Sequence, residues 1–332
     1  MAEEGVKQEI SKNFYEDKKW RFVSYAIWIG LALFLMMITM VGGAGKLSAI
    51  TAPKMLENIF QSWLILAILI PPMIMVSSTG GLDLSVGAVA GLVAVTAATA
   101  MVEGASGWIA VFIALKISIF IGLVNGLLIG LTRINGFVIT LGMATLARGA
   151  ALQLSQGGPA ALAGPDALFP GLSIVMVFFL ILLTIILIVL AELTPLGRKR
   201  FTNVENESLV LHLIRTAIPY LLSSVMAGFA GLLLLARLRT AFAGTGIGLE
   251  TEVILSLFLA GIPLGGGLFN VIGALIASFV VSLQKAVTIV NGTPVGVIQT
   301  QQGYGLLIFG VLSQVYFLAV NWFYKKQMAD KK

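Results

Sequence analysis

One stretch of the chain combines a carboxylate with glycines and small apolar residues. It runs from Thr79 to Gly91, holds Asp83 and Ser85 in a glycine-rich elbow, and leads directly into an apolar segment. Asp and Ser side chains cap the unpaired amides at the start of a helix, whereas ionisable groups beside hydrocarbon often handle substrate. We expect Asp83 to cap the helix, at a protein-lined interface or in the headgroup layer. A direct part in handling substrate is the alternative.

The overall composition places this elbow in a membrane protein. The chain has 332 residues, of which 58% are hydrophobic and 11% charged, and its mean hydropathy is +1.00. A soluble domain of this length cannot bury so much apolar surface. Runs such as Leu172 to Leu190 are long enough to cross the ~30 Å hydrocarbon layer as helices, and alternating barrel strands are missing from the sequence. The predicted fold class is an all-α, polytopic membrane protein.

Several kinds of chemistry are excluded by residue types alone. The chain has no cysteine and a single histidine, His212, so we expect no metal site. Residues 42–47 resemble a phosphate-binding loop but lack its pattern, and no hydrolytic motif is present. We therefore expect neither an enzyme nor a nucleotide or other cofactor bound by this chain. The net charge of +6 comes from basic residues at span ends, which favours membrane topology over nucleic-acid binding.

Ten apolar segments have membrane length, and the eighth is short and glycine-rich, so it is predicted to be broken or re-entrant. Residues 22–41 are too long for a signal-peptide core and form the first span. An even number of crossings puts both termini on one side, and with cytoplasmic termini fourteen of the 21 basic residues lie inside against four outside. The segments are about 22–41, 58–78, 84–103, 108–131, 137–155, 172–193, 217–236, 249–264, 268–290 and 303–323.

The chain is accordingly divided into a cytoplasmic N-terminal segment (1–21), a transmembrane domain (22–323) and a cytoplasmic tail (324–332). Lipid is one predicted partner. Three basic residues, Lys116, Arg148 and Lys285, fall inside predicted spans, where we expect each to reach an interface or point into the bundle.

Small residues recur at the spacing that allows helices to approach closely. The predicted packing positions are Gly87, Gly91, Gly122, Gly126 and Gly130. In addition, the elbow sequence at 81–89 is echoed at 267–275, which hints at the internal repeats found in transporters.

The largest predicted cytoplasmic connection spans about residues 197–216. From about Asn203 it can form an amphipathic helix along the membrane surface, suited to docking a cytoplasmic partner. The alternative is a solvated loop that runs into the seventh span. The candidate contact residues are Glu205, Glu207, Ser208, His212 and Arg215.

A set of motifs in order along the chain resembles the permease subunits of ribose-type ABC importers for monosaccharides, and the similarity covers residues from about 20 to 323. This resemblance implies a ten-span permease of the type II importer kind in the bacterial cytoplasmic (inner) membrane. It also implies a second permease copy, as a homodimer or heterodimer, two ATPase subunits that bind ATP and Mg²⁺, and a soluble extracytoplasmic sugar-binding protein. The motifs are NIFQ at 58–61, TGGLDLSVG at 79–87, GLVNG at 122–126, TLGMATLARG at 140–149, and AGTG at 243–246 followed by ETE at 250–252.

The chain departs from the family's pattern at three places. The cytoplasmic segment that couples to the ATPase is shortened and rewritten at 196–208, Pro71-Pro72 replace a Leu-Gly pair, and Leu259-Ala260-Gly261 replaces Leu-Gly-Gly. The docking residues given above would then have to hold the ATPase.

The leading interpretation is a sugar permease that works by alternating access. A neutral monosaccharide needs hydroxyl and amide groups along its path, and the candidates are Gln61, Asp83, Ser85, Asn125 and Thr140. One alternative keeps the machine and carries nucleosides or a furanone autoinducer. Others are an ion-coupled carrier acting alone and a scaffold that has lost transport.

Overall fold

The computed structural model describes residues 26–37, 47–162, 183–186, 209–263 and 270–329. This part of the chain is almost entirely helical. A short apolar helix covers Ala26–Met37, and two-residue strands β1 (Ala160–Ala161) and β2 (Thr240–Ala241) pair antiparallel. The labelled helices are α3 (Leu47–Ile50), α4 (Pro53–Ser77), α5 (Val86–Val102), α6 (Gly107–Thr132), α7 (Gly136–Leu154), α10 (Leu209–Leu238), α11 (Leu249–Leu259), α12 (Val271–Val290) and α13 (Val295–Ala329).

Six helices in the described ranges are long and apolar enough to cross a membrane: α4, α6, α7, α10, α12 and α13. The prediction of a helical, polytopic membrane protein is therefore confirmed. Helix α11 has 11 residues, which at 1.5 Å per residue span about 16 Å and do not cross the hydrocarbon layer alone. The total of ten spans and the cytoplasmic termini stay predictions, and most of the predicted segment 172–193 lies outside the described residues.

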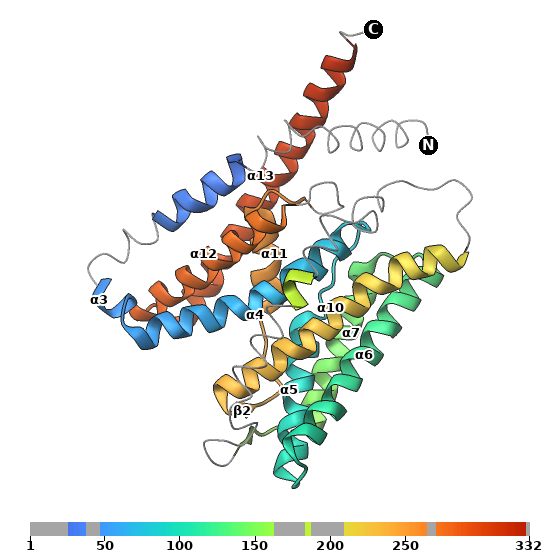
Figure 1. The fold of residues 1–332 in the computed structure, drawn as a ribbon, viewed down its shortest axis with the longest axis vertical. Helices are drawn as coiled ribbons and strands as arrows, with labels where there is room; N and C mark the ends of the chain where they lie inside the picture. The colour runs from blue at the N-terminus through green and yellow to red at the C-terminus, as the bar shows by residue number, and fades with distance from the viewer. Residues whose placement is uncertain (1–25, 38–46, 163–182, 187–208, 264–269, 330–332) are drawn as a thin grey trace.

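Helix α4 lies between two groups of helices (Figure 1). On one side it contacts α10, which packs along α6 and α5, while α7 packs on α5 and α6. On the other side it contacts α12 and α11, and α11 packs against α13. Because α4 touches both groups, a displacement of one group is transmitted to the other through this helix.

The second half of α4 is buried, and it runs as helix through Pro71 and Pro72. Each proline lacks an N–H, so two hydrogen bonds of the helix ladder are missing at this doublet. Membrane helices tolerate such sites where neighbouring helices cover them. Both prolines are buried here.

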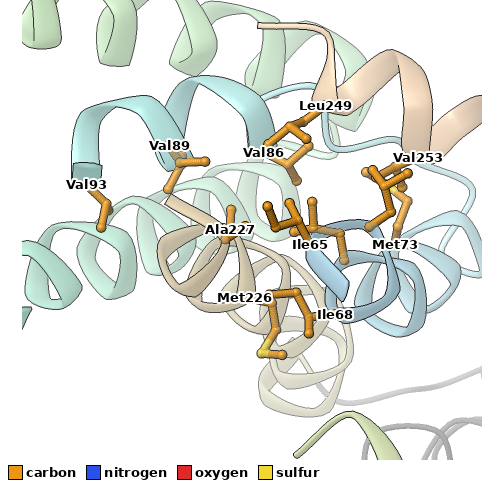
Figure 2. Packing of buried hydrophobic residues seen from close by; sticks show 14 of the residues in the cluster. Ile65, Ile68, Met73, Val86, Val89, Val93, Met226, Ala227, Leu249 and Val253 are labelled. Carbon is orange, nitrogen blue, oxygen red and sulfur yellow. The ribbon is translucent and has the colours of Figure 1, made fainter. Parts of the chain in front are cut away.

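Helix α5 is the centre of the first group. Its residues are small, and the run from Val86 to Ala98 is buried without interruption. Figure 2 shows Val86 of α5 beside Leu249 of α11 and Ile65 of α4, and Met226 of α10 beside Ile68 of α4, all in one buried cluster. The small side chains of α5 let the neighbouring helices pack closely around it.

The outer faces of α6, α7 and α13 are apolar and exposed. Examples are Phe120 of α6 at 66%, Leu146 of α7 at 68% and Leu307 of α13 at 69% exposed. A soluble protein does not leave such long apolar faces open, so these faces meet lipid or another membrane subunit.

Helix α10 corrects one expectation. Residues 209–215 were expected to end a separate helix along the membrane surface, but they are the first turns of α10, which continues unbroken to Leu238. The physical reason lies in α6, because Leu213 packs on Gly130 near the end of that helix. Residues 203–208, the other half of the expected helix, lie outside the described residues.

Candidate functional site

The elbow between α4 and α5 is shaped by glycines. Gly80 adopts a left-handed backbone with φ of 81°, a conformation that strains other residues. A side chain at Gly81 would collide with the hydroxyl of Tyr220, which reaches the elbow from α10. The same hydroxyl would collide with a side chain at Gly136, the first residue of α7. The two glycines therefore make room for one tyrosine.

The carboxylate of Asp83 lies inside the protein, with none of its surface exposed. Its Oδ1 accepts hydrogen bonds from the backbone N–H of Ser85 at 2.9 Å and from the Ser85 hydroxyl at 2.5 Å. Asn125 of α6 donates to the same hydroxyl at 3.2 Å. Ser85 is the N-cap residue of α5, and its own side chain makes no capping bond. Asp83 accepts the N–H of Ser85, one of the amides at the helix start that have no partner inside the helix, as expected.

Thr140 of α7 completes the elbow from another side. Its Oγ1 accepts the N–H of Leu84 at 3.1 Å and lies within donating distance of two carbonyls, those of Gly136 at 2.8 Å and Leu82 at 3.1 Å. Its side chain is fully buried. One hydroxyl thus ties α7 to the backbone on both sides of Asp83.

Four of the five predicted path residues are therefore brought together, and we call them the elbow cluster: Asp83, Ser85, Asn125 and Thr140. Gln61 is the exception. It lies in the first half of α4 and donates to Glu57, one turn earlier, at 3.0 Å. The 16 residues that separate it from the end of α4 correspond to about 24 Å of helix.

Tyr220 and Ser223 of α10 were missed by the sequence reasoning. Both are buried, at 0% and 1% exposed, and the Ser223 hydroxyl faces the carboxylate of Asp83. The usable signal was their spacing, because polar residues at i and i+3 in an apolar span share one helix face.

The predicted glycine ladder of α6 faces α10. A side chain at Gly126 would meet the Cα of Ala217 at 2.5 Å, and one at Gly122 would meet the Cα of Leu221 at 2.8 Å. Gly130 lies against Leu213, as described above. The two helix backbones are thus in near contact over the length of the ladder.

Gly87 and Gly91 of α5 face the loop between β2 and α11. A side chain at Gly87 would collide with the Glu250 carboxylate, and one at Gly91 would collide with the carbonyl of Thr245. Arg148 of α7 holds this loop, because its Nη1 donates to the carbonyls of Ala243 at 2.8 Å and Thr245 at 2.6 Å. Arg148 points into the bundle, one of the two outcomes expected for it.

A second polar contact joins the last three helices. Lys285 of α12 donates to Glu252 of α11 at 2.6 Å, and Gln302 of α13 donates to the same Oε1 at 3.3 Å. The Lys285 side chain is 42% exposed and that of Glu252 only 7%. Lys116, the third basic residue in a predicted span, is exposed and lies over the ring of Phe112 at 4.3 Å.

The predicted ATPase-contact residues divide between two regions. His212 and Arg215 lie in the first turns of α10, where both are partly buried. Glu205, Glu207 and Ser208 lie outside the described residues. In the described chain, no group of three or more His, Asp or Glu side chains is placed to hold a metal ion of the usual kind.

The elbow cluster, together with Tyr220 and Ser223, presents amide and hydroxyl groups and a single carboxylate where α5, α6, α7 and α10 meet. A family model described as the permease component of the branched-chain amino acid transport system matches residues 55–314. The chain belongs to this permease family. The match spans the elbow, the glycine ladder and the loop that Arg148 holds.

Curated relatives of this permease are known by their transport systems. This chain is 28% identical to the ribose import permease protein of Bacillus subtilis (strain 168), over 85% of its own length and 88% of the relative. It is 28% identical to the galactofuranose transporter permease protein of Escherichia coli (strain K12), over 69% and 70%. An autoinducer 2 import system permease protein of Photorhabdus laumondii is 32% identical over 67% and 69%. No solved structure matches the permease. The resemblance to ribose-type ABC permeases is thereby confirmed.

Proposed function

We propose that this permease carries a monosaccharide across the bacterial cytoplasmic membrane as part of an ATP-driven importer. Separate ATPase subunits would supply the energy, a second permease copy would complete the path, and an extracytoplasmic binding protein would deliver the sugar. The support for a sugar is the set of relatives, which includes permeases for ribose, galactofuranose and D-allose.

The observation that carries the mechanism is the continuity of α10. The same helix begins with His212 and Arg215, the predicted ATPase contacts, and places Tyr220 and Ser223 at the elbow. Five residues separate Arg215 from Tyr220, about 8 Å along the helix axis. Pro219 lies between them and removes the hydrogen bond to the carbonyl of Arg215, but the helix continues through it. A push on the first turns of α10 would therefore reach the tyrosine and serine through continuous helix and move them relative to Asp83.

The elbow cluster is closed in this conformation, because its side chains are 0% exposed. We propose that movement of α10 along the glycine ladder opens it, and that the freed amide and hydroxyl groups of Asn125 and Thr140 then contact sugar hydroxyls. Hydrogen bonds of this kind suit a neutral, hydroxyl-rich solute. The near contact of the α6 and α10 backbones favours sliding of these helices over their separation.

A reconstitution experiment tests the proposal. Vesicles containing the permease, its ATPase and internal ATP, with the binding protein outside, should accumulate labelled sugar. Vesicles with the permease alone should not, even with a proton or sodium gradient. Accumulation by the permease alone would refute the ATP-driven mechanism in favour of an ion-coupled carrier.

The second candidate cargo is an autoinducer of the furanone type. It is supported by the 32% identity to the autoinducer 2 permease over 67% of this chain, beside 28% to the ribose permease over a longer alignment of 85%. Binding measurements on the partner binding protein, with ribose, other monosaccharides and the autoinducer as separate ligands, distinguish the two cargoes. Tight binding of the autoinducer with no binding of sugars would refute the monosaccharide proposal while leaving the transport machinery intact.

A further inference from the structure

Four buried oxygen atoms at the elbow make no hydrogen bond of good geometry, although the Ser223 hydroxyl lies close to the Asp83 carboxylate and the Tyr220 hydroxyl lies close to Thr79. They are Oδ2 of Asp83, Oδ1 of Asn125 and the hydroxyl oxygens of Tyr220 and Ser223. Each side chain is at most 1% exposed. A buried polar atom without a partner is costly, and native proteins leave few of them. Four such oxygens at one place indicate that another group binds there.

These atoms come from three elements that meet at the elbow. Asp83 and Asn125 are joined through the Ser85 hydroxyl, to which both are hydrogen-bonded. Ser223 faces the Asp83 carboxylate from α10. Tyr220 lies within electrostatic range of the same carboxylate, with its hydroxyl pressed against the elbow backbone at Gly81.

The charge of Asp83 is not balanced by a basic side chain. In the described part of the chain it forms no ion pair, although three basic residues of the helices around it have identified partners elsewhere. Lys116 lies over an aromatic ring, Arg148 binds loop carbonyls, and Arg237 donates to Ser62. A carboxylate buried this deeply is stable only with a compensating positive charge or a proton.

We propose that the elbow binds one monovalent metal cation, Na⁺ in type, through these four oxygens. Hard cations prefer carboxylate, carbonyl and hydroxyl oxygens, which are the groups present. One carboxylate balances one positive charge, whereas divalent Ca²⁺ takes six to eight oxygens and usually several carboxylates. Irregular backbone between two membrane helices is also where transporters commonly bind Na⁺.

The bound cation would join α10 to the elbow, since two of its ligands come from the helix and one from the elbow itself. It would act as a fixed part of the closed conformation. This inference concerns the stability of the permease and does not depend on the cargo or on the source of energy for transport.

The test is thermal unfolding of the full chain, purified in detergent micelles, in NaCl or choline chloride at constant ionic strength. The wild-type midpoint should rise steadily with the logarithm of the Na⁺ concentration once binding saturates. Asp83→Asn removes the charged ligand and should abolish this dependence, or raise the half-saturating Na⁺ concentration by at least about tenfold. Ser223→Ala removes one neutral ligand and should weaken binding less.

The matched control is Ser282→Ala. Ser282 also has a buried hydroxyl without a hydrogen-bond partner, but it lies in α12 on the other side of α4. This variant should keep the full response to Na⁺. If Asp83→Asn does not fold, the Na⁺ dependence of the midpoint is measured in Ser223→Ala and Tyr220→Phe instead.

Three outcomes would overturn the proposal. The first is a midpoint that is equal in Na⁺ and choline. The second is a Na⁺ response that the elbow variants retain in full, because the ion then binds elsewhere. The third is a midpoint that ignores Na⁺ but falls as the pH rises in the wild type and not in Asp83→Asn, because a proton then neutralises the carboxylate.

Discussion

The interface between α6 and α10 can be tested by adding a single methyl group. A Cβ at Gly126 would lie 2.5 Å from the Cα of Ala217 and 2.9 Å from its carbonyl oxygen. Both are backbone atoms, so no side-chain rotation relieves the contact. Reaching an ordinary 3.4 Å contact requires the helices to separate by about 0.9 Å at this point.

Two opposing effects decide the stability of Gly126→Ala. Alanine in place of glycine within a helix is favourable by roughly 0.5–1 kcal/mol. Inserting a methyl group into a closely packed interface costs about 1–3 kcal/mol, and the backbone contact puts this site at the upper end. We expect a net loss of about 2 kcal/mol, together with slower ATP-driven uptake because the helices no longer slide in register.

Gly142→Ala is the matched control. Gly142 lies inside α7, and a Cβ there would meet no atom within 4 Å. This variant should be as stable as the wild type or slightly more stable. Apparent unfolding midpoints of the two purified variants, measured side by side, check the argument. Equal midpoints for Gly126→Ala and Gly142→Ala would show that the ladder is not a close backbone contact.

Three further substitutions test the other polar contacts. Thr140→Val keeps the side-chain shape but leaves the elbow amide unpaired, so unfolding should become easier by about 1–3 kcal/mol; Thr145→Val, at an exposed site on the same helix, should change little in the same denaturation assay. Lys285→Met leaves the buried charge of Glu252 without its lysine, with only the neutral donor Gln302 described beside it, and should cost more than Glu252→Gln, because the half-exposed lysine can turn outward; a midpoint for Glu252→Gln below that of Lys285→Met contradicts this order. Arg148→Met removes both bonds to the loop and should speed its cleavage in limited proteolysis, and an unchanged cleavage rate would refute the holding role.

The fold class was predictable because it depends on the hydrophobicity and length of continuous sequence segments. Hydrophobic runs of membrane length fix where helices must form, and α6 (Gly107–Thr132) and α7 (Gly136–Leu154) begin and end within about one turn of their predicted segments. The ends of α10 and α13 were less predictable. Helix α13 begins at Val295, eight residues before the predicted segment at 303, because the polar turns before that segment are also helical.

The candidate site was predictable only where polar residues were rare. Asp83, Asn125 and Thr140 are conspicuous in apolar surroundings, and each reaches the elbow. Gln61 is equally conspicuous in the sequence but bonds within its own helix. The difference depends on which face of α4 meets other helices, and this follows from tertiary packing. Tyr220 was overlooked for the opposite reason, since an aromatic residue in an apolar helix is usually core.

The continuity of α10 also bears on the shortened segment at 196–208. A permease in which a separate surface helix meets the ATPase can lose motion at the joint between that helix and the next span. In this chain the described residues from 209 onward form one helix that runs through Pro219. Leu213 and Ala217 before the proline and Leu221 after it all pack on α6, which holds the two parts of the helix in line. On the proposed mechanism a shorter coupling segment would then suffice, since the helix itself would carry the displacement. Inserting two glycines after Thr216 should therefore uncouple ATP hydrolysis from uptake while the elbow stays folded. Uptake at the wild-type rate in that variant would show that the rigid helix is not the route.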